Sequence, residues 1–147
     1  MSELEASAVG AAELPAMRAA IASAGLPAGD LAEPGLIRFA SAREGEILGY
    51  GGFEIYGADA LLRSIVVEPN RRRDGVGRRI VEQLSSYAVR RGVTQVFLLT
   101  TDGRAYFETL GFSVVDRRHA PASIAGARQM VGLCPASATL MTRTAAP

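Results

Sequence analysis

The sequence predicts a single α+β domain over residues 1–147, with a mixed central sheet of about six to seven strands flanked by helices. A length of 147 residues, 48% of them hydrophobic, is material for one buried core. Three strand-like segments follow one another in the first half, separated by tight turns. After residue 75 the hydrophobic period lengthens to that of a helix, and strands and helices then alternate.

The first predicted element is a helix over residues 12–24. Its apolar positions recur every three to four residues, as one buried helix face requires, at Leu14, Met17, Ile21 and Ala24. Gly25 suits the left-handed residue that ends such a helix. Prolines and glycines then mark residues 26–35 as a loop.

An antiparallel meander of three strands comes next, over residues 36–42, 47–56 and 60–67. Arg43-Glu44-Gly45-Glu46 combines a glycine with charges, which is typical of a hairpin turn. Pro69 ends the third strand.

The second half begins with a helix that starts at Gly75 and ends before Gly92. Its apolar stripe consists of Val76, Ile80, Leu84, Tyr87 and Ala88, and its polar side carries Arg78, Arg79, Glu82 and Arg90.

A buried parallel strand over 95–100 follows, and then a short helix over 104–110 that Gly111 caps. Two more strands are predicted over 112–117 and 137–142. The loop-like stretch between these two strands is long enough to indicate a functional role.

Composition excludes several functional classes. Sixteen Lys+Arg and fifteen Asp+Glu give a net charge of +1, so nothing global favours nucleic acid as a partner. One cysteine and one histidine allow no internal disulfide and leave little for a metal site, so no metal is expected and the cytoplasm is the expected compartment. The N-terminus is acidic, and no apolar run approaches the roughly 18–20 residues that span a bilayer, so membrane association is not expected.

The most informative stretch, residues 65–79, predicts a strand, a glycine-bearing loop and a helix start. Gly75 and Gly77 let backbone amides approach a ligand, and the helix directs its positive end at the same place. Nearby arginines would bind a diphosphate through charge-assisted hydrogen bonds, and they are Arg71, Arg72, Arg73, Arg78 and Arg79. Asp74 is expected to cap the helix.

Two other phosphate motifs do not fit this stretch. The Walker pattern needs Gly-Lys-Ser/Thr, and the dinucleotide fingerprint needs a third glycine where Ile80 stands. The alternative is that the arginines form only a solvated basic patch or a small nucleic-acid contact.

Arg72-Arg73-Asp74-Gly75-Val76-Gly77, placed after Val67-Glu68-Pro69, fills the form Arg/Gln-x-x-Gly-x-Gly/Ala and resembles the acetyl-CoA loop of GNAT-type N-acetyltransferases. The order of elements and the segment Tyr106–Phe112 are similar to that family too. The resemblance implies acetyl-CoA as cofactor. It implies that strand backbone binds the pantetheine arm, at Ile65, Val66 and Val67. It also implies that the loop and helix start hold the pyrophosphate, through Arg72, Arg73, Asp74, Gly75, Val76, Gly77 and Arg78.

Two subfamilies share further motifs with the chain. Leu99-Thr100-Thr101, then Phe107, Gly111-Phe112 and a final strand Ser137–Met141, resemble the acetyltransferase domain of N-acetylglutamate synthases. Ala60–Ser64 with Leu133–Ala138 resembles small GNAT proteins found with arsenic-resistance genes. Both resemblances imply an amino-acid-like acceptor bound near Ser64, Cys134 and Ser137. An arginine that the glutamate-binding group carries near Ser137 is Pro135 here.

Acetyl transfer to an amine requires a base, and the candidates are Glu54, Asp116 and His119. Glu54 is the first choice because it lies on one face of a glycine-rich strand, where a carboxylate is costly unless it faces a wet cleft. The alternative is that Glu54 is an ordinary solvated carboxylate on a strand, with no role in catalysis.

The general acid that would protonate the leaving thiolate is not evident at its usual position. Many GNAT relatives carry a tyrosine four residues before the Gly-Phe pair, but Phe107 occupies that position, beside the expected cofactor. Tyr106 would substitute only if the helix turned it inward, and otherwise it is an ordinary half-buried tyrosine. A thiol with a pKa near 8.5 also leaves tolerably as thiolate without an acid.

Arg63 and Ser64 are adjacent in a strand and are expected on opposite faces. Arg63 is a candidate clamp for an acceptor carboxylate, with surface pairing as the alternative. Cys134 has no identifiable His–carboxylate partner, so direct transfer is favoured over an acetyl-enzyme.

The sequence therefore predicts an N-acetyltransferase that acts on a small amino-acid-like amine, with a role in arsenic-related or toxic amino-acid resistance as one expectation. Family members are often homodimers. A non-catalytic CoA-binding sensor or regulatory module is the alternative, because the usual acid is absent.

Overall fold

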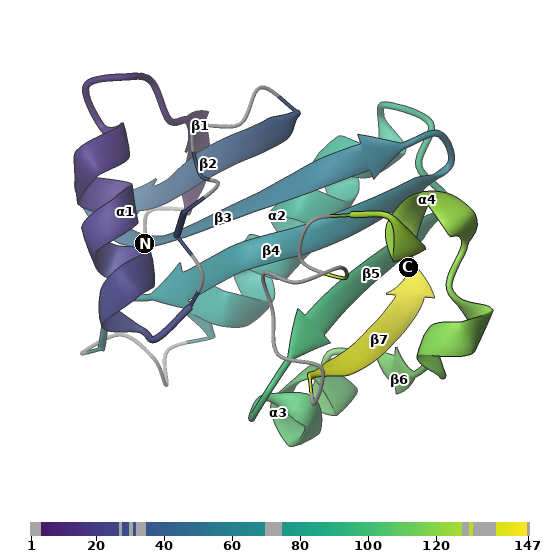
Figure 1. The fold of residues 1–147 in the computed structure, drawn as a ribbon. Coiled ribbons are helices and arrows are strands. Elements are labelled where there is room, and N and C mark those ends of the chain that lie inside the picture. Colours follow the sequence, from purple (N-terminus) through teal and green to yellow (C-terminus); the bar gives the residue numbers. More distant parts are fainter. Residues whose placement is uncertain are drawn as a thin grey trace. The chain divides into compact units, whose positions relative to one another are not determined.

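The computed structural model describes residues 4–26, 28–29, 31, 35–69, 75–127, 130 and 138–146. Hydrogen bonds join seven strands in the order β1-β2-β3-β4-β5-β7-β6 (Figure 1). This mixed sheet with its flanking helices confirms the predicted α+β class. By its contacts the chain divides into two compact units. Unit 1 comprises Met1–Glu54 and Leu62–Leu84, and unit 2 comprises Ile55–Leu61 and Ser85–Pro147.

The meander predicted for the first half is confirmed. Its strands are β2 (Leu36–Arg43), β3 (Glu46–Tyr56) and β4 (Asp59–Val67), and β2 and β3 pair antiparallel. Glu44 and Gly45 join β2 to β3 with φ angles of 53° and 81°. Two consecutive left-handed residues make the tight turn whose twist suits a hairpin.

The structure adds an edge strand that the sequence did not predict. β1 (Glu5–Ala8) pairs antiparallel with β2, and all of its residues are exposed. Because neither face of β1 is buried, the segment has no alternation of apolar and polar residues from which a strand could be predicted.

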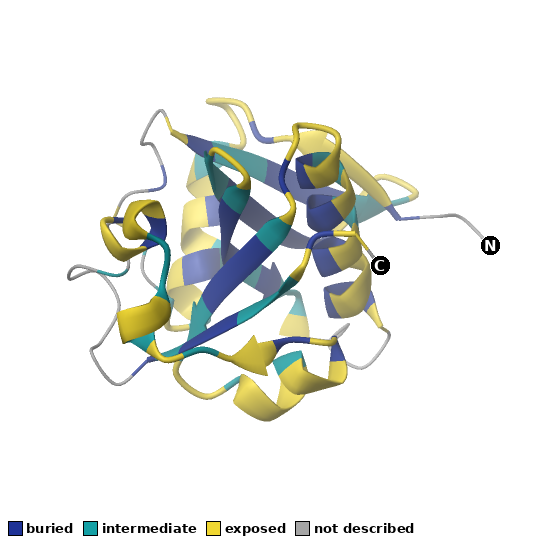
Figure 2. Cartoon of the chain, turned by 90° about the vertical axis from the view of Figure 1, so that its right-hand side faces the viewer, coloured by how far each residue is buried: buried dark blue, intermediate teal, exposed yellow. Residues whose placement is uncertain are grey.

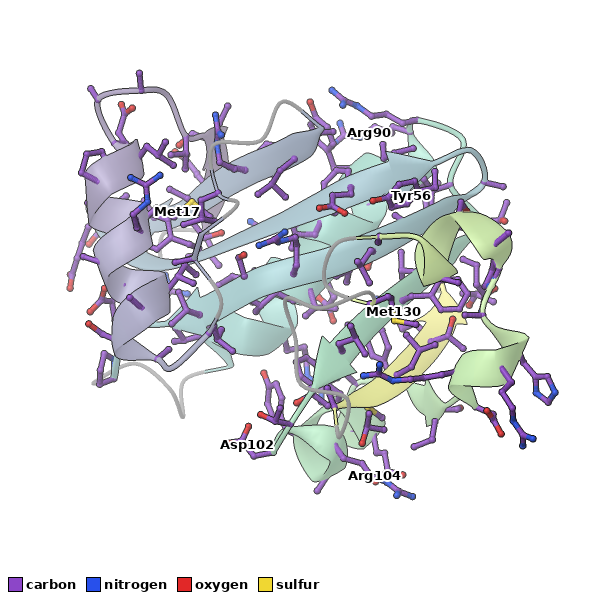
Figure 3. All side chains as sticks on the ribbon, viewed as in Figure 1. Met17, Tyr56, Arg90, Asp102, Arg104 and Met130 are labelled. Atoms are coloured by element: carbon purple, nitrogen blue, oxygen red, sulfur yellow. The ribbon has the colours of Figure 1, made fainter. Side chains whose placement is uncertain are left out.

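The first predicted helix is confirmed as α1 (Leu14–Ser23). It begins later than expected because Pro15 occupies its first turn, where a missing backbone N–H costs nothing. Met17, labelled in Figure 3, and Ile21 are fully buried and pack with Leu36 and Tyr50 in the α1 core of unit 1.

Helix α2 (Val76–Val89) confirms the predicted amphipathic pattern. Ile80 and Leu84 of its buried stripe contact β3 on the face opposite the α1 core, where β3 carries Gly49 and Gly51. A Cβ atom built on Gly49 would lie 2.7 Å from Ile80 Cδ1, and one on Gly51 would lie 2.8 Å from Leu84 Cδ1. The absence of side chains at these two positions therefore lets α2 pack closely on the strand.

In unit 2 the first three residues of β4 pair in parallel with β5 (Gln95–Thr100). β7 (Thr139–Thr144) pairs antiparallel with β5, and β6 (Ser113–Val114) pairs with β7. The unit 2 core contains Leu61, Phe97, Ile124 and Leu140, with Tyr56 and Met130, both labelled in Figure 3, packed against it.

The sequence prediction was less accurate between β5 and β7. Helix α3 (Arg104–Thr109) is confirmed, but the strand predicted over 112–117 is only the two-residue β6. The Asp116 carboxylate accepts a hydrogen bond from the Arg118 amide and starts the 3₁₀ helix η2 (Arg117–His119). Such a side-chain acceptor competes with strand pairing.

Two further differences concern the C-terminal third. A one-turn helix, α4 (Ala122–Ala125), lies in the stretch predicted as loop, and its Ile124 is fully buried. The last strand runs from Thr139 to Thr144 instead of over 137–142. Figure 2 shows the buried residues concentrated on the strands and on one side of the long helices.

Candidate functional site

The second half of β4 forms the first part of the candidate site. Within unit 2, β4 pairs in parallel with β5 from Asp59 with Gln95 to Leu61 with Phe97, and β4 continues in unit 1 from Leu62 to Val67. A strand can bind an extended ligand through its backbone groups.

The backbone of β4 is irregular just beyond this point. Ser64 is buried and has a φ of 57°, a left-handed conformation that is rare for a serine inside a strand. Arg63 Nε donates a hydrogen bond to Ser64 Oγ at 3.2 Å. The expectation that these two side chains point to opposite faces is therefore wrong, because the left-handed residue interrupts the alternation.

The predicted base and the predicted acceptor clamp contact each other. Arg63 Nη1 lies 3.3 Å from Glu54 Oε1, and this ion pair joins β4 to β3 within unit 1. The Arg63 side chain is 0% exposed, whereas that of Glu54 is 13% exposed. The guanidinium is thus covered, and of the two side chains only that of Glu54 reaches solvent.

The C-terminal end of β4 is held in unit 1 by a hydrogen bond to β3 and by burial in the α1 core. Glu68 N donates to Leu48 O of β3 at 2.8 Å, and Val66 is buried in the α1 core. Ile65 and Val67 are half-buried. Burial, with a smaller contribution from the charge of Glu68, raises the pKa of the neighbouring Tyr50 hydroxyl, which therefore stays protonated at neutral pH.

The predicted anion site lies at the start of α2. Gly75 has a φ of 75°, and its carbonyl accepts the hydrogen bond from Arg79 N at 3.2 Å, so Gly75 occupies the capping position. Asp74, the predicted cap, lies outside the described residues, as do Arg72 and Arg73. Val76 and Gly77 are buried and Arg78 is exposed. The first amides of any α-helix have no acceptor within the helix, so this end attracts anions.

The candidate acid belongs to unit 2. Tyr106 is 45% exposed on α3 and does not turn inward within its unit. Its ring packs edge-on against Phe107 at 5.3 Å, and Phe107 packs in the same way on Phe112 at 5.8 Å. Phe107 thus belongs to an aromatic cluster of α3 and the residues that follow it.

The two other candidate bases also lie in unit 2, where both are exposed. Hydrogen bonds from the Arg118 side chain and amide, with a smaller contribution from the charge of His119, lower the pKa of Asp116 to about 2. Such a carboxylate is a weak base at neutral pH. Cys134 and Ser137, the other predicted acceptor-binding residues, lie outside the described residues.

The arrangement of strand, left-handed glycine and helix start agrees with a comparison of the sequence with known families. The profile of the Acetyltransferase (GNAT) family matches residues 8–112. The chain belongs to this family.

The relatives compared with this GNAT chain are distant from it in sequence. An uncharacterized N-acetyltransferase of Chlorobaculum tepidum is 28% identical over 87 residues, which make up 58% of this chain and 56% of that protein. N-acetylglutamate synthase from Neisseria gonorrhoeae, solved with coenzyme A and N-acetyl-glutamate, superposes with a TM-score of 0.81 at 14% identity, over 100% of this chain and 36% of that one. A Mycobacterium tuberculosis protein solved with CoA gives a TM-score of 0.73 at 16% identity, over 95% of this chain and 98% of that one.

The GNAT chain thus spans little more than half of its curated relative and about a third of the synthase. At these identities the structural likeness shows the fold alone. No helix in the described part of the chain is long and apolar enough to cross a membrane.

Sequence reasoning missed two features of the GNAT chain that shape the site. The first is the close packing of α2 on Gly49 and Gly51, for which the glycine run in β3 was an available signal. The second is the left-handed Ser64, for which the sequence carries no signal because serine has no preference for that conformation.

Proposed function

We propose that this GNAT chain is an acetyl-CoA-dependent N-acetyltransferase that transfers acetyl directly to the amine of a small amino-acid-like acceptor. The observation that carries the proposal is the left-handed Gly75, which lies after β4 and directly before the 14-residue helix α2. Together with the small, buried Gly77 and the exposed Arg78, it fits the diphosphate of CoA. The CoA-containing structures of the Neisseria and Mycobacterium proteins support the same cofactor.

The residues of unit 1 would divide the binding of the cofactor between two segments. The amides at the start of α2, with Arg78, would hold the pyrophosphate. The backbone of β4 around Val66 and Val67 would bind the pantetheine arm, because an extended ligand can bind along a strand through the strand's backbone groups. Bound acetyl-CoA supplies an acetyl thioester whose thiol, with a pKa of about 8.5, needs no protein acid to leave.

Glu54 is proposed as the group that accepts the amine proton. The amine nitrogen forms a bond to the thioester carbon, the bond from that carbon to sulfur breaks, and the proton that the nitrogen loses goes to the Glu54 carboxylate. Glu54 is suited to this because its ion pair with Arg63 keeps the carboxylate at one position while 13% of the side chain stays exposed.

The proposed acceptor class is a small molecule with an amino-acid-like amine. It is supported by two sets of motifs, each of which resembles one GNAT subfamily. Ala60–Ser64 with Leu133–Ala138 resembles the small GNAT proteins found with arsenic-resistance genes, and Leu99–Thr101 with Phe107, Gly111-Phe112 and Ser137–Met141 resembles the N-acetylglutamate synthases. A more specific form of the proposal is a role in arsenic-related resistance or in toxic amino-acid resistance. A cytoplasmic location and a homodimer remain predictions from the sequence.

The experiment is a thiol-release assay with acetyl-CoA and a panel of amino acids and simple amines. A thermal-shift screen in the presence of acetyl-CoA selects the panel, because an acceptor that binds only the folded state raises the melting temperature. The proposal expects amine-dependent release of free thiol. Binding of acetyl-CoA without turnover on any amine would favour the CoA-binding sensor instead, and failure to bind acetyl-CoA would exclude both.

The base is tested separately with Glu54→Gln. The amide keeps the size of the side chain but accepts no proton, so kcat should fall by roughly 10²–10⁴ at neutral pH, with recovery as the pH approaches the pKa of the amine. Glu82→Gln, on the exposed side of α2, is the matched control. Wild-type kcat in Glu54→Gln from pH 6 to pH 9 would remove Glu54 from the mechanism.

A further inference from the structure

The ion pair between Arg63 and Glu54 is asymmetric in its exposure. The arginine side chain is 0% exposed, whereas 13% of the glutamate side chain reaches solvent. A ligand that approaches from solvent can therefore reach part of the Glu54 side chain, whereas the Arg63 side chain is covered. In this conformation the Arg63 side chain is not accessible from solvent, and it contacts the partly exposed Glu54 through their ion pair.

Arg63 also has a second polar partner on its own strand. Its Nε donates to Oγ of Ser64, while its Nη1 contacts Glu54 on the neighbouring strand. The planar guanidinium fixes the directions of these two contacts relative to each other. It thereby couples the position of the Glu54 carboxylate to the left-handed turn of the backbone at Ser64.

We propose that Arg63 is a positioning residue for Glu54. This inference rests on the proposed function, in which Glu54 receives the amine proton. The buried guanidinium holds the carboxylate in the orientation that meets the acceptor, and it does not itself bind the acceptor carboxylate. A small displacement of a reacting group costs up to about 100-fold in rate, so loss of this support should appear in kcat.

The alternative clamp role for Arg63 makes different predictions. A clamp would contribute to acceptor binding whether or not Glu54 were intact, so its loss would raise the acceptor KM in both backgrounds. A positioning residue acts only while the group that it positions is present. A double-mutant cycle on kcat therefore separates the two roles.

The experiment compares the wild type, Arg63→Met, Glu54→Gln and the double variant, each at full length with acetyl-CoA and the best acceptor of the panel. Methionine has a similar length but no charge. We expect Arg63→Met to lower kcat by about 10- to 100-fold in the wild-type background and by less than about threefold in Glu54→Gln. The KM for acetyl-CoA should not change. Arg90→Met, at the exposed end of α2 and labelled in Figure 3, should leave kcat within about twofold.

Arg63→Lys provides a second test. Lysine keeps the charge beside Glu54 but lacks the planar fork, so its kcat should lie between those of the wild type and Arg63→Met. If Arg63→Met does not fold, the cycle is carried out with Arg63→Lys instead. Two results would overturn the positioning role alone. One is an equal loss of kcat on replacing Arg63 in the wild type and in Glu54→Gln, and the other is a rise in the acceptor KM when Arg63 is replaced in the Glu54→Gln background. Absence of turnover by the wild type on every amine would overturn the proposed function itself.

Discussion

Glu54 Oε1 lies 3.3 Å from Nη1 of Arg63, and the arginine side chain of this ion pair is completely buried. A buried charge is tolerated only with a partner, because its transfer out of water costs several kcal/mol. Glu54 supplies a compensating charge to Arg63 from the neighbouring strand. The pair therefore has a structural role in unit 1 that can be measured independently of any activity.

Removal of the carboxylate should be strongly destabilising. Glu54→Ala leaves Arg63 buried without this counter-charge, and we expect the free energy of unfolding to fall by about 3 kcal/mol, at the lower end of the range for broken buried pairs. Chemical denaturation measures the change, with Glu82→Ala as an exposed control that should stay within about 0.5 kcal/mol of wild type. The double variant Glu54→Leu/Arg63→Met removes both charges, so it should be more stable than Glu54→Ala. If Glu54→Ala were instead more stable than the double variant, the two charges would not be coupled.

Ser64 should show an inverted order of stability among its variants. Glycine in a strand interior usually destabilises relative to alanine, by about 0.5–1 kcal/mol. At a φ of 57° a Cβ atom is itself unfavourable by about 1–2 kcal/mol. Ser64→Gly should therefore be more stable than Ser64→Ala by about 1 kcal/mol. Ser64→Val, with its branched Cβ, should be the least stable. Denaturant titration of the three variants would contradict the left-handed assignment if alanine were more stable than glycine.

The close approach of α2 to β3 predicts that Gly49→Ala is costly. A Cβ atom at this position would lie 2.5 Å from the backbone oxygen of Val66 and 2.7 Å from Ile80 Cδ1. Because the backbone cannot rotate away, we expect a loss of about 1–3 kcal/mol in the free energy of unfolding. Gly35→Ala is the control, since nothing lies within 4 Å of its added Cβ. Equal stability of the two variants would exclude the close contact.

The low pKa of Asp116 predicts a specific pH dependence. Because hydrogen bonds from Arg118 lower this pKa from 3.8 to about 2, the carboxylate contributes to stability above pH 4 and loses that contribution as the pH falls toward 2. An NMR titration of the carboxyl carbon should give a midpoint near 2. Arg118→Ala should move that midpoint upward, whereas Arg91→Ala at the end of α2 should not. An unchanged midpoint in Arg118→Ala would show that another group lowers the pKa.

Elements with a clear hydrophobic period could be predicted from the sequence. The buried residues of α1 and α2 have the predicted spacing because each helix has one face on a core. β1 could not be predicted in this way, because it is exposed on both faces. The segment 112–117 has strand-like composition, but the Asp116 side chain binds the Arg118 amide and ends β6 after two residues.

The site was predictable to different extents in its two parts. The segment proposed to bind phosphate is local in sequence, so glycine spacing and the adjoining strand and helix were sufficient to predict the start of α2 at Gly75. The contact between Glu54 and Arg63 depends on how β3 and β4 lie together and on the left-handed Ser64. Strict alternation therefore predicted the orientation of Arg63 and Ser64 incorrectly.

The phosphate-binding role of the α2 start is tested by Gly77→Val. The branched side chain would occupy space that the diphosphate of CoA must approach, while valine is still compatible with a helix. We expect the affinity for acetyl-CoA, measured by calorimetry, to fall at least about tenfold, equivalent to about 1.4 kcal/mol. Glu82→Val introduces the same side chain on the exposed side of the same helix and should bind acetyl-CoA like the wild type. Circular dichroism establishes that both variants are folded. Unchanged binding in a folded Gly77→Val protein would show that the diphosphate lies elsewhere, because no other contact of acetyl-CoA in this proposal depends on the second residue of α2.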